Sequence, residues 1–324
     1  MAVPQRLPEQ AEGLAFGPVP SRRLGRSLGV NTIPPKVCSY GCIYCQVGVT
    51  DTKQMERRPF FAPQQIADAA AARLEEVRAR GEAVDYLTIV PDGEPTLDVR
   101  LGESIGLLRR LGVPVAVISN GSLLWDADTR ADLAEADWVS VKMDAATEEV
   151  WRRVNHPHPG LALDRVLAGI ARFTAEFDGI LCTETMLVSR VNDSAASVGA
   201  VADILGGMPI DVAYLAVPTR PPAMPGVRAA RPPALNRAYQ IFSDRLAHVE
   251  YLVGFEGEFF STTDDVVRDL LATSAVHPLR ESAVAAMLAS ASAPWRIVNE
   301  LVSAHQLRRV SYGGEQYYLR AYDS

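Results

Sequence analysis

The chain has 324 residues, of which 48% are hydrophobic and 22% are charged, and its formal net charge is −7. This length allows one large domain and a small second one. The negative charge argues against indiscriminate binding to nucleic-acid phosphates, although a local basic patch is compatible with an acidic total.

The N-terminal segment, residues 1–16, has neither the apolar core nor the cleavage pattern of a signal peptide. No later stretch approaches the roughly 18 uninterrupted apolar residues that suggest a membrane span. We therefore expect a flexible tail over residues 1–16, no membrane partner and a cytoplasmic location.

From residue 27 onward, short apolar runs alternate with amphipathic helical patterns, which is typical of βα units around a parallel sheet. Helices are predicted over 66–80 and 163–177, because apolar residues recur there at the helical period. Ligands of parallel α/β folds gather where the strands end, so polar residues at strand ends are candidates for a site. The predicted strands are 27–32, 85–90, 115–119, 138–143, 179–188 and 211–215.

Three of the four cysteines lie in the loop after the first predicted strand. Cys38, Cys42 and Cys45 form a C-x3-C-x2-C pattern, which offers three thiolates to a four-iron four-sulfur cluster and leaves one iron open. Electron-transfer clusters are usually closed by four cysteines, so this set favours a cluster that also binds a small molecule. A zinc clip is the alternative, but zinc sites take four ligands. Cys182 is expected in the core, and no disulfide framework is implied.

The segment after the second predicted strand reads Pro-Asp-Gly-Glu-Pro-Thr over residues 91–96. Taken alone, it is typical of an Asp-Gly turn. Beside a ligand, its glycine would let the backbone approach closely. After the third predicted strand, Ser119 and Asn120 either contact a ligand or belong to the cap of a helix that begins near Asp126.

Charged residues also follow the fourth predicted strand and interrupt the fifth. Lys142 and Asp144 are two residues apart and are expected on one face, where they must be solvated, paired or bound to a ligand. Glu184 lies between Cys182 and Met186 in a nearly continuous apolar run. An unpaired buried carboxylate is costly, so Glu184 is a candidate functional residue.

Beyond residue 260 the pattern changes to three short predicted helices and a hairpin around Gly313 and Gly314. We interpret residues 261–324 as a winged-helix-like domain, which packs against the larger domain, dimerises, or holds a peptide, RNA or DNA. Its arginines do not outnumber its acidic residues, which weakens DNA binding. The predicted helices are 264–272, 281–290 and 294–305, and the predicted hairpin strands are 308–312 and 315–319.

The cysteine spacing, with the aromatic Tyr44 before the third cysteine, resembles that of the radical S-adenosylmethionine (SAM) superfamily. The resemblance implies an α/β fold, a partial (β/α)6 TIM-like barrel over residues 17–260, with a 4Fe-4S cluster and SAM as cofactors. It further implies that SAM chelates the open iron and that one electron from the reduced cluster cleaves it. The resulting 5′-deoxyadenosyl radical takes a hydrogen atom from a substrate. A donor such as flavodoxin or ferredoxin would supply the electron.

The resemblance also assigns roles to residues at the strand ends. Asp92, Gly93 and Glu94 match the superfamily's Gly-Gly-Glu motif, with Asp92 in place of the first glycine, and would hold the SAM amino group. Ser119 and Asn120 would contact the SAM carboxylate or ribose.

On the later strands, the resemblance makes Asp144 an acceptor for a ribose hydroxyl and places Lys142 near the SAM carboxylate or the substrate. Lys142 and Glu184 are the candidate catalytic residues, and both also count as cofactor-binding, as does Tyr44. The position of Glu184 is similar to a superfamily strand motif that ends in glutamate, although most of the glycines of that motif are missing here.

Segments 17–29 and 152–159 resemble small radical SAM proteins related to the tRNA wyosine-base synthases, which form a tricyclic guanine from pyruvate. A tRNA base is therefore a candidate substrate. Those synthases carry a second cluster on three further cysteines, whereas this chain has only Cys182 to offer.

Both segments carry basic residues with two interpretations. Arg22, Arg23 and Arg26 contact nucleic-acid phosphates or pair with acidic neighbours. His156 and His158 steer a proton or only shape a proline-rich loop.

Two classes of function follow. The first is a radical SAM enzyme that acts on RNA, a peptide or a metabolite. The second is a non-catalytic iron-sulfur sensor whose winged-helix-like domain binds DNA or a peptide. A SAM pocket around Glu94, Asp144 and Glu184 separates the two, because a sensor needs a cluster but no SAM.

Overall fold

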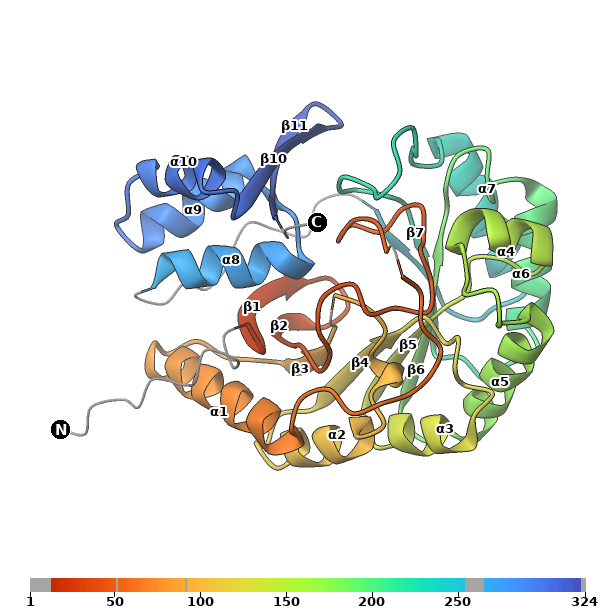
Figure 1. The fold of residues 1–324 in the computed structure, drawn as a ribbon. Coiled ribbons are helices and arrows are strands. Elements are labelled where there is room, and N and C mark those ends of the chain that lie inside the picture. Colours follow the sequence, from red (N-terminus) through yellow and green to blue (C-terminus); the bar gives the residue numbers. More distant parts are fainter. Residues whose placement is uncertain (1–12, 51, 91, 254–264, 322–324) are drawn as a thin grey trace.

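The computed structural model describes residues 13–50, 52–90, 92–253 and 265–321. Within these ranges the chain forms a partial α/β barrel with helices around its outside and a small C-terminal unit beside its first strands (Figure 1). The barrel sheet has eight strands in sequence order, with β1 antiparallel to β2 and all later neighbours parallel. The strands are β1 Ala15–Ser21, β2 Gly25–Val30, β3 Tyr86–Ile89, β4 Val115–Ser119, β5 Trp138–Lys142, β6 Ile180–Met186, β7 Val212–Ala216 and β8 Val249–Leu252.

The six predicted strands correspond to β2 through β7, so the barrel is confirmed but its expected strand number was too low. β1 was missed because Gly17, Pro18 and Pro20 interrupt it, and proline is tolerated in a sheet mainly at an edge, where β1 lies. β8 was missed because it is short and carries no apolar alternation. β1 also begins inside the predicted tail 1–16, of which residues 1–12 lie outside the described residues.

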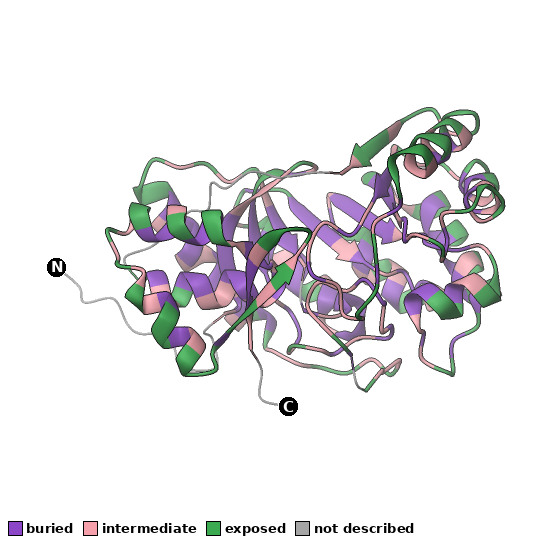
Figure 2. Cartoon of the chain, turned by 90° about the horizontal axis from the view of Figure 1, so that it is seen from above, coloured by how far each residue is buried: buried purple, intermediate pink, exposed green. Residues whose placement is uncertain are grey.

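The helices cover the outer face of the sheet and bury one side each, as the burial colouring shows (Figure 2). In α5, Val166, Ile170 and Phe173 follow the helical period and are buried in the main core. Both predicted barrel helices, 66–80 and 163–177, are present as α1 and α5. The helices are α1 Pro63–Ala79, α2 Leu101–Arg109, α3 Ala127–Ala134, α4 Glu148–Asn155, α5 Leu163–Glu176, α6 Ala195–Leu205 and α7 Pro232–Ser243.

The C-terminal unit has a core of its own, built around Leu270, Val284 and Val298. Its hairpin turns at Gly313 and Gly314, whose φ angles of 59° and 86° suit a two-residue turn that other residues adopt at a cost. The strand β9 was missed because it has only two residues. The elements are α8 Val266–Val276, β9 Leu279–Arg280, α9 Glu281–Ser290, α10 Arg296–Ser303, β10 Leu307–Tyr312 and β11 Glu315–Arg320, with β11 central in a three-stranded sheet.

This order of elements agrees with the helices and hairpin expected there. The predicted boundary at 260/261 falls in 254–264, outside the described residues, so the winged-helix-like domain stays an interpretation. In the described part of the chain, no helix is both long and apolar enough to cross a membrane.

The C-terminal unit joins the barrel through polar contacts. Asp269 on α8 and Arg73 on α1 form an ion pair at 3.1 Å, with both side chains buried. The hydroxyls of Tyr312 and Tyr317 donate to the carbonyls of Pro218 and Thr219, at 3.2 and 3.0 Å, in the segment after β7. The unit therefore fixes part of the barrel's rim.

Candidate functional site

A cavity of about 260 Å³ lies where the barrel strands end, and the predicted cluster ligands Cys38, Cys42 and Cys45 all line it. Further residues of its wall come from the ends of several strands and from the rim. These include Arg23, Tyr44, Gln46, Asp92, Gly93, Ile118, Lys142, Glu184, Met186, Ala216 and Arg220.

The cysteine loop is hydrogen-bonded to the turn after β3. Lys36 N donates to Asp92 O at 2.7 Å, and Glu94 N donates to Val37 O at 2.9 Å. A Cβ on Gly93 would stand 1.9 Å from the carbonyl oxygen of Val37, so only glycine fits this close approach. Gly93, which was predicted to let a ligand approach the backbone, thus also lets the cysteine loop pack closely against it.

The end of α4 and the segment that follows it hold the other side of the cysteine loop. Gly41 N and Ile43 N donate to the carbonyls of Asn155 and Val154, both at 3.0 Å, and His158 N donates to Ser39 O at 2.8 Å. Residues 152–159 therefore form the backing of the cysteine loop, which means the backbone segment that packs behind it. His156 takes a left-handed conformation at the end of α4, which fits the loop-shaping interpretation.

Two side-chain amides approach the cysteine sulfurs. Asn120 Nδ2 lies 3.7 Å from Cys38 Sγ, and Asn155 Nδ2 lies 3.4 Å from Cys42 Sγ. Burial, and next the charge of Asp144, raise the pKa of the Cys42 thiol to about 12. Half-buried thiols that face one cavity, two of which receive amide N–H groups, suit an iron-sulfur cluster, whose irons favour the thiolate form.

Glu94 is buried and accepts hydrogen bonds from neutral groups only. Its donors are Ser119 Oγ and Asn120 N, both at 2.7 Å, and Thr96 N and Oγ1 at 3.1 and 2.6 Å. Burial raises the pKa of Glu94, and these hydrogen bonds act against that rise. Glu94 therefore ties the end of β3 to the end of β4.

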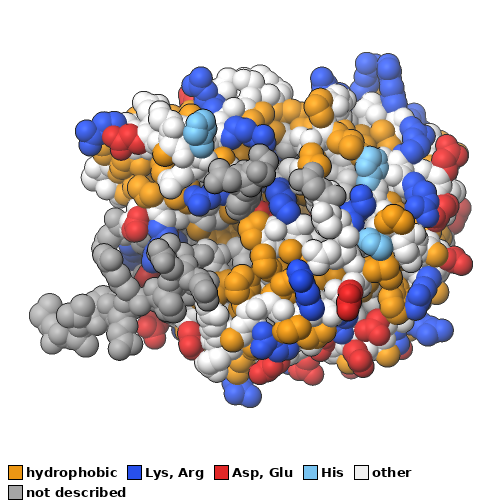
Figure 3. Space-filling model, viewed as in Figure 1, with side chains coloured by type: hydrophobic (Ala, Val, Ile, Leu, Met, Phe, Trp, Pro, Cys, Tyr) orange, Lys and Arg blue, Asp and Glu red, His pale blue; other side chains and the backbone are white. Residues whose placement is uncertain are grey.

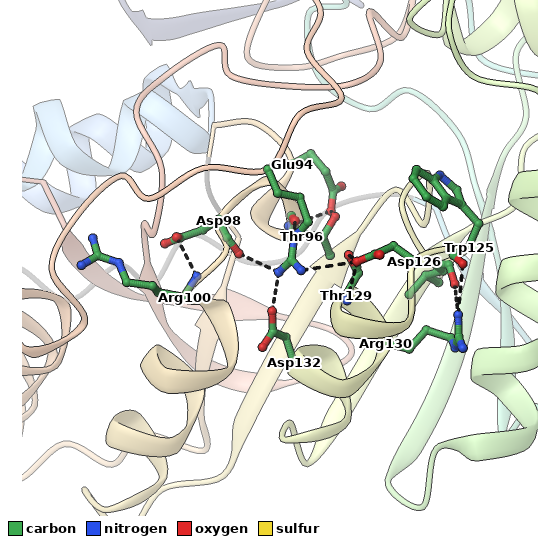
Figure 4. Close-up of polar contacts among 11 residues, drawn as sticks. Glu94, Thr96, Asp98, Arg100, Trp125, Asp126, Thr129, Arg130 and Asp132 are labelled. Carbon is green, nitrogen blue, oxygen red and sulfur yellow. Dashed lines mark hydrogen bonds and ion pairs between the residues drawn. The ribbon is translucent and has the colours of Figure 1, made fainter.

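The turn that carries Glu94 is supported by α3, whose Asp126 and Asp132 face it (Figure 4). Arg57 Nε donates to Thr96 O at 2.9 Å, while its guanidinium pairs with Asp132 and, at 3.5 Å, with Asp126. Asp126 caps α3 by accepting from Thr129 N at 2.9 Å. The alternative that Ser119 and Asn120 cap this helix is therefore wrong.

Glu184 differs from Glu94 because two cations flank it. Arg23 Nη1 lies 2.5 Å from Glu184 Oε2, and Lys142 Nζ contacts Glu184 Oε1. Burial works to raise the pKa of Glu184, but Lys142 and Arg23 bring it down to about 2. Glu184 is thus an anion at neutral pH, and Arg23 pairs with an acidic neighbour rather than facing outward as a phosphate contact would.

The sequence of residues 32–197 matches the profile of the radical SAM superfamily. A UPF0026 protein of Methanocaldococcus jannaschii is 38% identical to this chain over 309 residues, which cover 95% of this chain and 96% of that protein. The chain belongs to the radical SAM superfamily, in its UPF0026 group. It is a radical SAM enzyme, and membership implies a 4Fe-4S cluster and SAM.

Solved structures agree with this radical SAM fold. A radical SAM methyltransferase from Sphaerobacter thermophilus superposes with a TM-score of 0.54 at 19% identity, covering 70% of this chain and 67% of that one. A structure of TYW1 with a lysine-pyruvate adduct gives a TM-score of 0.46 at 13% identity, covering 91% of this chain and 80% of that one. The first supports the fold alone, and the second is too distant to support any conclusion about fold or substrate.

In this radical SAM protein, Asp144 lines a separate, very small cavity with Lys142, Trp151 and Asn155. It accepts hydrogen bonds from the Tyr44 hydroxyl, from Asn155 Nδ2 at 2.7 Å and from Met186 N at 2.8 Å. Burial raises the pKa of Asp144. Lys142 lines both this cavity and the main one, and its charge acts against the rise in the pKa of Asp144, although its ion pair is with Glu184.

Several residues of the site were not among its predicted members. Gln46, next to Cys45, donates to Val276 O of the C-terminal unit at 2.9 Å and accepts from Arg220 at 2.9 Å. Arg220 also lies 3.0 Å from His277 Nε2. Neighbouring positions in the sequence give no signal of these contacts, because they join three distant segments.

Cys182 belongs to a small apolar cluster with Leu24, Ala116, Trp138 and Tyr214, in agreement with the expected core role. On the face seen in Figure 3, basic side chains are scattered and acidic ones lie mostly along the lower and right edges, with no single broad basic area among the described residues of that face. This agrees with the acidic total and gives no support to phosphate binding there.

Proposed function

We propose that the cavity holds a 4Fe-4S cluster on Cys38, Cys42 and Cys45, and SAM beside it, and that the enzyme removes a hydrogen atom from a substrate that enters at the rim. One observation carries the proposal: the three cysteines share a single cavity wall with Asp92, Gly93 and further polar residues at the strand ends. The reduced cluster, when bound, supplies the electron that cleaves SAM.

The residues after β3 and β4 would bind the amino end of SAM. Asp92 and Gly93 line the cavity, with Asp92 only 3% exposed and its carboxylate 3.9 Å from Lys36 Nζ, whereas Glu94 is 1% exposed and is not part of the cavity wall. We assign to Glu94 the task of fixing Ser119 and Asn120, and to Asp92 and Gly93 direct contact with the ammonium group. The predicted charge-assisted contact of Glu94 itself requires it to exchange one of its four present donors.

Lys142, at the end of β5, and Arg23, between β1 and β2, would bind the opposite charge. Lys142 and Arg23 are cations on the cavity wall, and Glu184 holds both in place. A ligand carboxylate beside Lys142 would gain a charge-assisted hydrogen bond. We assign to Asp144 the orientation of Tyr44 and Asn155, in place of the ribose contact expected from the sequence.

For the substrate, we propose a tRNA base as the first class to test, based on the resemblance of segments 17–29 and 152–159 to the wyosine-base synthases. The cavity rim at Pro218–Arg220 contacts the C-terminal unit, so a substrate would pass between the two parts. Comparing the modified nucleosides in tRNA from wild-type and deletion strains tests this class. Identical nucleoside profiles would exclude it and leave a peptide or a metabolite.

The function is tested by anaerobic reconstitution followed by reduction in the presence of SAM. We expect about four irons per chain and formation of 5′-deoxyadenosine, with both lost in Cys38→Ala, Cys42→Ala and Cys45→Ala. Cys182→Ala is the matched control and should retain its iron, because Cys182 lies in an apolar cluster. Loss of iron in the control would overturn the assignment of ligands. A wild-type protein that binds the cluster but neither binds nor cleaves SAM would instead support the sensor.

A further inference from the structure

The side chain of Asn155 bridges a cysteine and a buried carboxylate. Asn155 is the last residue of α4 and is 2% exposed. Its Nδ2 atom lies 3.4 Å from Cys42 Sγ and 2.7 Å from Asp144 Oδ2. An amide NH2 group carries two hydrogens, so it can donate to both acceptors at once.

Asp144 determines which way this amide faces. An ionised carboxylate only accepts hydrogen bonds, so turning the amide over would place Asn155 Oδ1 against both Asp144 and the cysteine sulfur. Asp144 is itself held by the Tyr44 hydroxyl and, at 2.8 Å, by Met186 N. The N–H group is thereby directed at Cys42 by a network that comes from the cysteine loop, α4 and the end of β6.

We propose that Asn155 is a positioning residue that raises the reduction potential of the cluster by donating an N–H group to Cys42, with Asp144 fixing its orientation. This rests on the proposed function, in which Cys42 is a cluster ligand. A reduced cluster carries one more negative charge than an oxidised one, and hydrogen bonds to sulfur therefore stabilise it more. Asn120 acts on Cys38 in the same way but from 3.7 Å, with a smaller effect.

The test is a redox titration of the reconstituted cluster in wild-type protein and Asn155→Ala, followed by electron paramagnetic resonance. At a fixed solution potential, we expect the ratio of reduced to oxidised cluster to fall about tenfold in the variant, which is a shift of about 59 mV for one electron. Asn120→Ala should shift in the same direction by less.

Asn192 offers a matched control. It is also a buried asparagine with 2% exposure, and its Nδ2 donates to the carbonyls of Asp144 and Met186, both at 2.9 Å. Removing it perturbs the same neighbourhood without removing a donor to sulfur, so the potential in Asn192→Ala should equal that of the wild type. Equal shifts in the Asn155 and Asn192 variants would overturn the proposal.

The iron content of each sample distinguishes a failure of the proposed function from a failure of the role proposed for Asn155. Wild-type protein that takes up no cluster would contradict the proposed function, whereas an iron-replete Asn155→Ala protein with a wild-type potential would contradict only this inference. If Asn155→Ala takes up no iron, Asn155→Ser is titrated instead. Its shorter side chain cannot reach both acceptors, and an unchanged potential in it would equally overturn the role of Asn155.

Discussion

Glu94 and Glu184 are both buried glutamates at the strand ends, with exposures of 1% and 5%, yet their surroundings differ. Hydroxyl and N–H groups surround Glu94, and burial raises its pKa. For Glu184, burial acts in the same direction, but Lys142 and Arg23 bring its pKa to about 2. The hydrogen-bonding and ionic partners of each carboxylate, rather than its depth of burial, therefore determine the direction in which its pKa shifts. The β3–β4 side suits a cationic group, and the β5–β6 side suits an anionic one.

The largest expected effect comes from neutralising Glu184. In Glu184→Gln, Arg23 and Lys142 lose their carboxylate while their side chains stay only 15% and 20% exposed. Removing one partner of a buried ion pair is costly, and we expect the free energy of unfolding to fall by about 3 kcal/mol, at the low end because water reaches both cations. Urea unfolding of the cluster-free protein measures this. A loss no larger than that of Glu94→Gln would break the comparison.

Lowering the pH should gradually remove the contribution of Glu184 to the free energy of unfolding. Its pKa is about 2 in the folded protein against an ordinary value of 4.5, so its stabilisation is present above pH 4.5 and disappears as the pH falls towards 2. The difference in unfolding free energy between wild type and Glu184→Gln should therefore shrink over this window. The pKa of Glu94 is raised, so its pH dependence is the opposite: its contribution to the free energy of unfolding decreases as the pH rises. A difference that stays constant from pH 5 to 2.5 would contradict the ionic description of Glu184.

A smaller effect is expected from Glu94→Gln. The amide oxygen can still accept from Ser119 and Thr96, but the NH2 group faces the N–H of Asn120, which loses its acceptor. One lost hydrogen bond and one buried donor cost about 2 kcal/mol, partly offset because no charge is buried any longer. The same urea experiment measures the loss, with Glu184→Gln as the reference. A cost above that of Glu184→Gln would show that neutral donors can support a buried carboxylate as strongly as cations do.

The smallest effect should come from Ser119→Ala, which removes one donor to Glu94 and leaves Asn120 and Thr96 in place. We expect the free energy of unfolding to fall by about 1 kcal/mol. The pKa of Glu94 should rise further, because a hydrogen bond that lowers it is lost. Carboxyl chemical shifts in a pH titration of wild type and variant measure that change. A lower pKa in the variant would contradict the role given to the hydroxyl.

The sequence predicted the parts of the site that depend on local patterns. Cys38, Cys42, Cys45 and Gly93, singled out by the cysteine spacing and the glycine after β3, line one cavity, and their roles toward a cluster and SAM stay predictions. β4 was predicted with the bounds observed, because Pro114 precedes its apolar run and the polar residues Ser119 and Asn120 end it.

The failures have a common physical origin in contacts between distant segments. Lys142 and Asp144 both line the small cavity, as expected of residues on one face, but the sequence did not indicate that Lys142 forms its ion pair with Glu184. Arg23 and Glu184 were each noticed, yet their pairing depends on the curvature of the barrel, because the turn between β1 and β2 and strand β6 are not neighbours in the sheet. Gln46 gave no signal, because its partners are on the rim and on α8.

The backing of the cysteine loop also bears on the timing of synthesis. The loop is secured by Val154, Asn155 and His158, and by Met224, whose N–H donates to Ile43 O at 3.0 Å. At 5 to 20 residues per second, the ribosome needs on the order of 10 to 40 seconds to proceed from Cys45 to Met224. During that interval the three thiols are outside the ribosome without the segments that shield them. Cluster delivery is therefore expected to follow completion of the barrel, and oxidation of the nascent chain is the hazard that precedes it.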